Sequence, residues 1–205
     1  MAGRGTVPVQ PCARPVAGGS DPLASQTPAE NRIECGACQL RPPPFETSLI
    51  PYRYAPPMDQ LIRQFKFKGR LEIAPLLADL LHGAMPPDRR PDLLIPIPLH
   101  DGRLNERGFN QALELTRHLR RLTSVPSDYH TLVRVRDTAQ QSALDQKARR
   151  TNVADAFESR QVLDGLHVAL IDDVVTTGAT VCEAASVLLN AGARVVEVWA
   201  IARTP

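Results

Sequence analysis

The sequence is organised around Val168-Ala169-Leu170-Ile171-Asp172-Asp173-Val174-Val175-Thr176-Thr177-Gly178-Ala179-Thr180. Its first four residues are apolar, and a short apolar run that ends at carboxylates predicts a strand buried on both faces. Asp172 and Asp173 come next, where a parallel strand is expected to end. Ligands of open α/β sheets bind at that edge of the sheet, so these two carboxylates are candidate site residues.

The loop after the carboxylates is rich in hydroxyl groups and contains Gly178, and the segment 180–191 has a helical pattern. Backbone N–H groups at a helix N-terminus favour anions, so this loop predicts a phosphate site. Carboxylates one short segment away suit sugar hydroxyls, and they suit a divalent cation carried by a polyphosphate. Together these groups indicate the binding of an activated ribose phosphate.

Two other interpretations of this stretch explain less of it. In the first, the aspartates only cap a turn and Thr180 caps the helix, which accounts for one or two of the polar residues. The second is a P-loop, which is excluded because no Gly-x-x-x-x-Gly-Lys followed by Ser or Thr occurs in the chain.

The stretch resembles the phosphoribosyl pyrophosphate (PRPP) signature of type I phosphoribosyltransferases. That signature is an apolar strand, two acidic residues, two apolar residues and Thr-Thr-Gly-x-Thr, and every position is met here. The resemblance implies that Asp172 and Asp173 bind the ribose hydroxyls, with Mg²⁺ held mainly by PRPP and water. It also implies a PRPP-binding segment made of Val174, Val175, Thr176, Thr177, Gly178, Ala179 and Thr180.

The composition is that of an ordinary globular domain. The chain has 205 residues, of which 43% are hydrophobic and 22% are charged, enough for one core and an accessory segment. A net charge of +2 does not indicate a large nucleic-acid surface. No apolar run approaches the roughly 20 residues of a membrane span, so we expect no membrane insertion. The N-terminus lacks the apolar core of a signal peptide, and the cytoplasm is the expected location.

Residues 1–44 are predicted to be a tail followed by a degenerate zinc-ribbon-like segment, and residues 45–205 the phosphoribosyltransferase-like domain. Residues 1–34 are rich in Pro, Gly, Ser and Ala, which is typical of a tail. Cys35 and Cys38 form a C-x-x-C pair with Cys12 upstream, so these three are candidate zinc ligands. Structural zinc takes four ligands, and a redox pair or unused thiols remain open alternatives.

The rest of the chain alternates helical and extended patterns. Helices are predicted over 58–68, ending at Gly69, over 73–81, and over 112–122 with Leu115, Leu119 and Leu122 on one face. Strands are predicted at 52–54, at 92–99 with prolines at its end, and at 194–202. The basic residues Arg63, Lys66, Lys68 and Arg70 alternate with aromatic residues. A solvated basic face is favoured over a nucleic-acid contact.

The segment 128–160 is long, basic and without clear periodicity. Such an insertion in a compact domain favours a functional lid over an anionic substrate, and the alternative is a solvated surface loop. We call this segment the hood. It contains the candidate ligand contacts Arg134, Arg136, Gln141 and Arg149.

Four further segments resemble the ComF family of competence-associated, phosphoribosyltransferase-like proteins. They are Leu61-Ile62…Lys66…Lys68-Gly69, Ile95 to Leu99 with Arg103 and Arg107-Gly108-Phe109-Asn110-Gln111, Arg134-x-Arg136-x-Thr138-x-x-Gln141-x-x-Leu144, and Arg149-x-x-Asn152-x-x-x-Ala156-Phe157. The resemblance covers the chain from about Tyr52 onward, together with the C-x-x-C pair. It implies a type I fold with a mostly parallel sheet flanked by helices, a flexible hood, a Mg²⁺–PRPP site and a link to uptake of transforming DNA. It also implies a pyrophosphate loop made of Pro96, Ile97, Pro98, Leu99, Arg103 and Arg107.

Two functions from different classes follow from these observations. The first is a transferase that moves phosphoribose from PRPP to an unknown acceptor and releases pyrophosphate. The second is a non-catalytic adaptor of the DNA-uptake machinery that senses PRPP, or weakly binds single-stranded DNA or a partner protein. The sequence leaves open whether the chain acts as a monomer or a homodimer.

Overall fold

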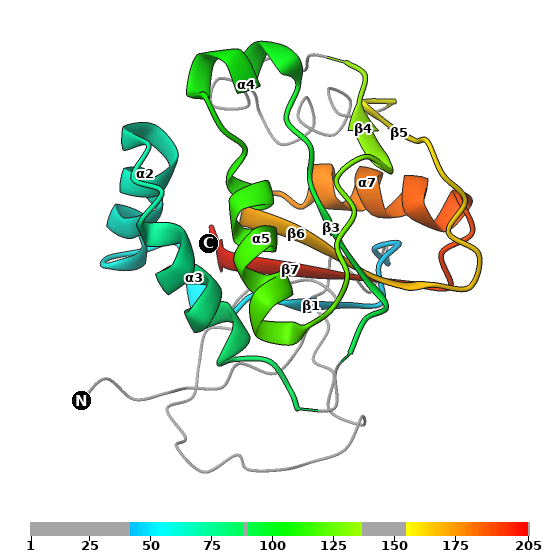
Figure 1. Cartoon of the computed structure of the whole chain (residues 1–205), viewed down its shortest axis with the longest axis horizontal. Coiled ribbons are helices and arrows are strands. Elements are labelled where there is room, and N and C mark those ends of the chain that lie inside the picture. Colours follow the sequence, from blue (N-terminus) through cyan, green and yellow to red (C-terminus); the bar gives the residue numbers. More distant parts are fainter. Residues whose placement is uncertain (1–41, 88–89, 137–154, 205) are drawn as a thin grey trace.

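The computed structural model describes residues 42–87, 90–136 and 155–204. Five parallel strands form the central sheet in the order β1-β7-β6-β3, with β2 also paired to β7 (Figure 1). Their bounds are β1 Thr47–Leu49, β2 Tyr52–Arg53, β3 Leu93–Pro96, β6 His167–Val175 and β7 Val195–Arg203. The helices are α2 Met58–Lys68, α3 Ile73–His82, α4 Asp101–Arg107, α5 Gln111–Thr123 and α7 Ala179–Asn190.

Strand β6 is buried on both faces, as its apolar run predicts. Side chains alternate along a strand, so Val168 and Leu170 face one side and Ala169 and Ile171 the other. The first pair packs in a core with α7, and the second pair packs with α2, α3 and α5. Figure 1 shows these helices on opposite sides of the sheet. The sheet is therefore the middle layer of three, and the polar end of β6 lies between two helical layers.

The edge of the sheet beside β7 is one strand with an interruption. Leu49 of β1 pairs with Trp199, and Tyr52 of β2 pairs with Ala202, so both strands advance three residues between these points. Pro51 lies between them and has no N–H to donate to the sheet. The predicted strand at 52–54 is thus the last part of a longer, interrupted edge strand. The first part of that edge, β1, was not predicted.

The helix ends follow local chemistry. Helix α2 ends at Gly69, which adopts the left-handed φ of 60° expected from the sequence. Helix α5 begins at Asn110, whose Oδ1 accepts hydrogen bonds from the N–H groups of Ala112 and Leu113 at 2.9 and 3.3 Å. One detail of the predicted face of α5 is wrong, because Leu122 is 39% exposed while Leu115 and Leu119 are buried.

Part of the hood has regular structure that the sequence did not predict. Strands β4 Leu132–Arg134 and β5 Phe157–Ser159 form an antiparallel pair beside α7. Hood residues 137–154 lie outside the described residues, as do residues 1–41 with Cys12, Cys35 and Cys38. The zinc prediction therefore stays a prediction. Within the described ranges, no helix is both long and apolar enough to cross a bilayer.

Candidate functional site

A polar cleft opens at the carboxyl ends of β3 and β6, where the sequence placed the site. Its volume is about 150 Å³, and it lies between the loop after β3, the end of β6 and the start of α7. Most of the residues that line it carry polar or charged side chains. The predicted site residues among them are Ile97, Leu99, Arg103, Arg107, Arg134, Asp172, Asp173, Val174, Val175, Thr176, Gly178 and Thr180.

The two carboxylates lie within β6 and not after it, which corrects the predicted end of the strand. The strand continues to Val175, which pairs with Arg203 of β7. Alternation then places Asp172 on the α7 side of the sheet and Asp173 on the side of α2 and α5. Asp172 is half-buried, whereas Asp173 is 5% exposed. The two acids therefore share one cleft but stand in different surroundings.

Asp172 is held by the backbone of its neighbour. Its Oδ1 accepts a hydrogen bond from the N–H of Asp173 at 2.8 Å. Burial, and then the charge of Asp173, raise the pKa of Asp172 to about 7 from an ordinary value of 3.8. This carboxyl group therefore titrates near neutral pH.

Asp173 is paired with Lys66 of α2, a residue that the sequence did not place in the site. The Lys66 Nζ lies 2.9 Å from Oδ2 and 3.2 Å from Oδ1 of Asp173. The Asp173 Oδ1 also accepts a hydrogen bond from the N–H of Val174 at 2.9 Å. Lys66 lines the cleft, so the basic face predicted for α2 is wrong at this position.

The loop before α7 turns into the helix at Gly178. Gly178 is the N-cap of α7 with φ of 82°, a left-handed conformation that favours glycine. The N–H of Ala179 donates to Oγ1 of Thr177 at 3.4 Å. Thr176, Gly178 and Thr180 line the cleft, whereas Thr177 and Ala179 are not among its lining residues. The first turn of α7 thus points its positive dipole end at the cleft.

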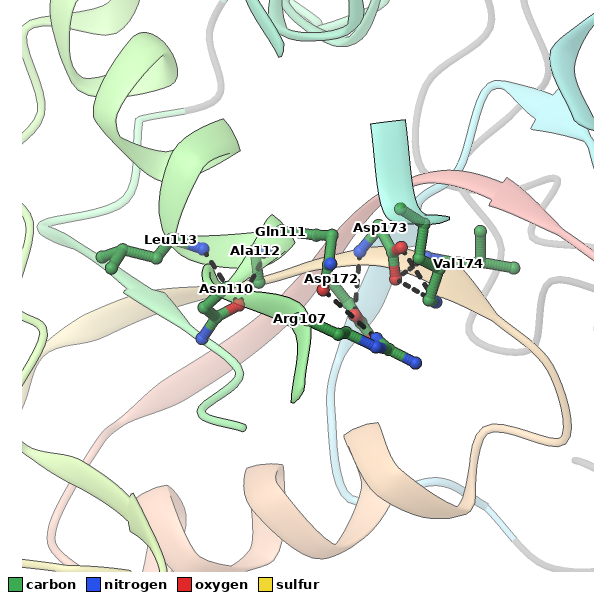
Figure 2. A network of polar contacts seen from close by, with 9 residues as sticks. Arg107, Asn110, Gln111, Ala112, Leu113, Asp172, Asp173 and Val174 are labelled. Atoms are coloured by element: carbon green, nitrogen blue, oxygen red, sulfur yellow. Dashed lines mark hydrogen bonds and ion pairs between the residues drawn. The ribbon is translucent and has the colours of Figure 1, made fainter. Parts of the chain in front are cut away.

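The loop after β3 reaches the cleft through helix α4, which the sequence did not predict. Ile97 donates its N–H to the carbonyl of Ile171 at 2.9 Å, which fastens the loop to β6. Arg103 and Arg107 lie on α4 and line the cleft, whereas Pro96 and Pro98 are not among the lining residues. Arg107 donates to Oε1 of Gln111 at 3.4 Å. Figure 2 shows Arg107 and Gln111 beside the two carboxylates.

The outer face of Arg107 meets an aromatic ring. Its guanidinium carbon lies 5.7 Å from the centroid of Phe67, a residue of α2 that is 69% exposed.

Two polar residues of the cleft, Asn110 and Gln111, were not predicted as site residues, although they belong to a segment that resembles the ComF family. Both line the cleft. The side chain of Asn110 donates to the carbonyl of Ile97, 13 residues earlier in the chain, and Gln111 accepts its hydrogen bond from Arg107, only four residues earlier.

The described part of the hood contributes one arginine to the cleft. Arg134 of β4 lines it, and its guanidinium carbon lies 5.3 Å from the centroid of Phe157, its partner across the hairpin. Arg136 is exposed and is not among the lining residues. Gln141 and Arg149 lie outside the described residues.

The "Phosphoribosyl transferase domain" family matches residues 104–205 of this chain. This match covers the cleft from α4 to the C-terminus and, with the parallel sheet between helical layers, it confirms the predicted fold class. Two solved structures are similar at low identity. The glutamine PRPP amidotransferase from B. subtilis has 18% identity and a TM-score of 0.42, over 62% of this chain and 25% of that chain. The purine phosphoribosyltransferase from Pyrococcus horikoshii has 16% identity and a TM-score of 0.37, over 67% of this chain and 85% of that chain.

Curated relatives are similar over most of the chain. The "DNA utilization protein YhgH" of Salmonella typhimurium is 40% identical over 86% of this chain and 80% of its own length. The "Competence protein F" of Haemophilus influenzae is 35% identical over 82% of this chain and 78% of its own. The "Competence protein ComFC" of Bacillus subtilis is 35% identical over 69% of this chain and 57% of its own. The chain therefore belongs to the ComF family of proteins with a phosphoribosyltransferase domain.

Proposed function

We propose that this protein binds PRPP together with Mg²⁺ and transfers phosphoribose to an acceptor with release of pyrophosphate, in the handling of transforming DNA. One observation carries the proposal. A single cleft joins both carboxylates of β6, the loop that begins α7, and arginines from two separate segments. This set offers hydrogen-bond acceptors for sugar hydroxyls and two distinct regions for phosphate groups.

The 5′-phosphate of PRPP fits the loop before α7. Thr176 and Thr180 line the cleft there, and Gly178 turns the backbone into the helix. The positive end of the helix dipole and the N–H groups of the first turn favour a phosphate at this position. Thr177 supports the loop from behind through its hydrogen bond with the N–H of Ala179.

The ribose hydroxyls fit the carboxylates. Asp172 has one oxygen engaged by a backbone N–H, which leaves lone pairs for a hydroxyl donor. When the bond between C1 and the pyrophosphate oxygen breaks, the electron pair leaves with pyrophosphate and positive character develops on the ribose. A fixed carboxylate beside the ring stabilises that charge before the lone pair of the acceptor forms the new bond to C1.

The pyrophosphate fits the arginines of the cleft. Arg103 and Arg107 of α4 and Arg134 of the hood line the cleft, and guanidinium groups bind phosphate oxygens in a bidentate manner. Within the described part of the chain, no group of three or more His, Cys, Asp or Glu side chains could hold a metal ion. In this proposal a hydrated Mg²⁺ held mainly by the ligand and by water would neutralise the charge of the leaving pyrophosphate.

Calorimetry with Mg²⁺ and PRPP tests the binding step, and a pyrophosphate-release screen over bases and amines tests the transfer step. We expect binding by the wild-type protein and weaker binding by Asp172→Asn. A charge-assisted hydrogen bond contributes roughly 1.5–3 kcal/mol, so the affinity should fall by about tenfold or more. Equal affinities of the wild type and the variant would remove Asp172 from the site. No binding by the wild type would remove the proposed function.

The second function, a non-catalytic adaptor that contacts single-stranded DNA, is favoured by the exposed ring of Phe67. An exposed aromatic side chain near cations can stack on a base. The four basic residues of the sequence pattern do not form one free patch, because Lys66 pairs with Asp173 and Arg70 pairs with Glu72 at 2.7 Å. We expect weak, salt-sensitive binding of a single-stranded oligonucleotide by fluorescence anisotropy, and a loss of that binding in Phe67→Ala. An unchanged affinity of Phe67→Ala would exclude this surface.

A further inference from the structure

Lys66 reaches the cleft from a part of the chain that contributes no other lining residue. It lies 107 residues before its partner Asp173 in sequence, and α2 comes before the residues matched by the phosphoribosyltransferase domain. The Lys66 side chain is 23% exposed and the Asp173 side chain is 7% exposed. The pair is therefore partly withdrawn from water, where the interaction between opposite charges is stronger than at an open surface.

The position of Lys66 is fixed by the packing of the residue before it. Phe65 is fully buried, and its ring centroid lies 5.6 Å from that of Phe109. Phe109 precedes Asn110, which caps α5 and donates to the carbonyl of Ile97 at 3.0 Å. Helix α2 is thus anchored to the same junction that holds the loop after β3. Because this packing fixes α2, it also limits where the ammonium group of Lys66 can lie in the cleft.

The hydrogen-bonding capacities of the two partners are unequal. A carboxylate offers about four lone-pair sites. Asp173 uses one of these for the N–H of Val174, and both of its oxygens lie within 3.2 Å of the Lys66 Nζ. An ammonium group carries three donors, and a single carboxylate engages at most two of them. Lys66 therefore keeps a donor for another oxygen inside the cleft that it lines.

We propose that Lys66 is a ligand-binding residue of this site, which donates a hydrogen bond to an oxygen of bound PRPP while Asp173 holds its ammonium group in place. This inference rests on the proposed function. It assigns different roles to the two carboxylates. Asp172 faces the ligand directly, and Asp173 acts mainly as the residue that positions Lys66. The oxygen that Lys66 contacts belongs either to the ribose 5-phosphate part or to the pyrophosphate.

Calorimetry on Lys66→Met tests the inference, because methionine keeps an unbranched side chain of similar size and removes the charge. We expect the affinity for PRPP with Mg²⁺ to fall by about tenfold or more, as for the loss of a charged hydrogen bond. Lys66→Arg should restore much of the loss, because a cation returns to the same place. Lys68→Met is the matched control: Lys68 is exposed, ends the same helix and is not among the cleft residues, and this variant should bind like the wild type.

Ribose 5-phosphate, which lacks the pyrophosphate, identifies the oxygen. If Lys66→Met weakens binding of both ligands, the contacted oxygen lies on the ribose 5-phosphate part. If it weakens binding of PRPP alone, the oxygen lies on the pyrophosphate. Thermal unfolding of each variant shows whether the fold is kept, and Lys66→Gln serves if the methionine variant does not fold.

The outcomes that contradict the inference are distinct from those that contradict the proposed function. Wild-type affinity for both ligands in Lys66→Met would overturn the inference and leave the proposed function standing. An equal loss in Lys66→Arg and Lys66→Met would show that a cation at this position does not restore binding, and would also overturn the inference. Failure of the wild-type protein to bind PRPP would overturn the proposed function, and the role of Lys66 would fall with it.

Discussion

The side chain of Asn110 joins the loop after β3 to the start of helix α5, because its Nδ2 donates to the carbonyl oxygen of Ile97 at 3.0 Å while its Oδ1 caps the helix. Ile97 belongs to the loop after β3 and is itself bonded to β6 through its N–H. A single amide therefore sets the position of α5 relative to the wall of the cleft. Neither of these two hydrogen-bonding roles requires Asn110 to touch the ligand.

Substitutions at Asn110 separate these two roles. Asn110→Asp keeps an oxygen cap for α5 but removes the donor to Ile97, so we expect near-normal stability and weaker PRPP binding. Asn110→Ala removes both, and loss of an N-cap costs about 1 kcal/mol, or roughly 2–4 °C in Tm for a chain of this size. Thermal unfolding and calorimetry on both variants check this. Normal PRPP affinity of Asn110→Asp would show that the bond to Ile97 does not shape the site.

The raised pKa of Asp172 predicts a pH-dependent stability. The folded protein keeps the proton on Asp172 between its ordinary pKa of 3.8 and the folded value of about 7, where the unfolded chain has released it. The contribution of this group to stability is therefore complete below the lower value and is lost as pH rises through about 7. Asp172→Asn should remove this dependence and be more stable than the wild type above pH 7. Because other groups also titrate, the measurement is the difference in Tm between variant and wild type across pH 4–8. A difference that does not change with pH would contradict the prediction.

The sequence predicted the parts of the fold that depend on short-range chemistry. Helix α2 ends at Gly69 and β6 follows its apolar run. Both depend only on the residue types of a short stretch, the glycine that ends the helix and the apolar residues that form the buried strand. Several of the parts that it missed depend on distant partners. Strand β1 has three residues and is recognised only by its pairing with β7, and β4 finds β5 across an insertion. Lys66 was assigned to a basic surface because its partner Asp173 is remote in sequence.

The Lys66–Asp173 pair predicts unequal effects of the two conservative substitutions in β6. Asp173→Asn leaves a partly buried ammonium without its counter-charge, so we expect it to cost about 1–3 kcal/mol of unfolding free energy. Asp172→Asn removes a carboxylate whose ionisation is opposed by burial, so we expect no loss of stability at neutral pH. A double-mutant cycle of Asp173→Asn with Lys66→Met should give a coupling free energy of about 0.5–3 kcal/mol, measured by urea unfolding. Additive effects of these two substitutions would mean that the pair does not stabilise the fold.

The last prediction compares two glycines that share a conformation but not a location. Gly178 precedes α7 in the cleft with φ of 82°, and Gly165 precedes β6 at the opposite end of the sheet with φ of 75°. A Cβ added at either position would meet no atom within 4 Å, so alanine is strained by its backbone and not by a clash. Because both residues have left-handed φ values, Gly178→Ala and Gly165→Ala should each cost roughly 1–2 kcal/mol of unfolding free energy. Only Gly178→Ala shifts the loop that is proposed to hold the 5′-phosphate, so only this variant should bind ribose 5-phosphate and PRPP more weakly in calorimetry. Equal losses of affinity in both variants would mean that global destabilisation weakens binding, and unchanged affinity in both would place the 5′-phosphate elsewhere in the cleft.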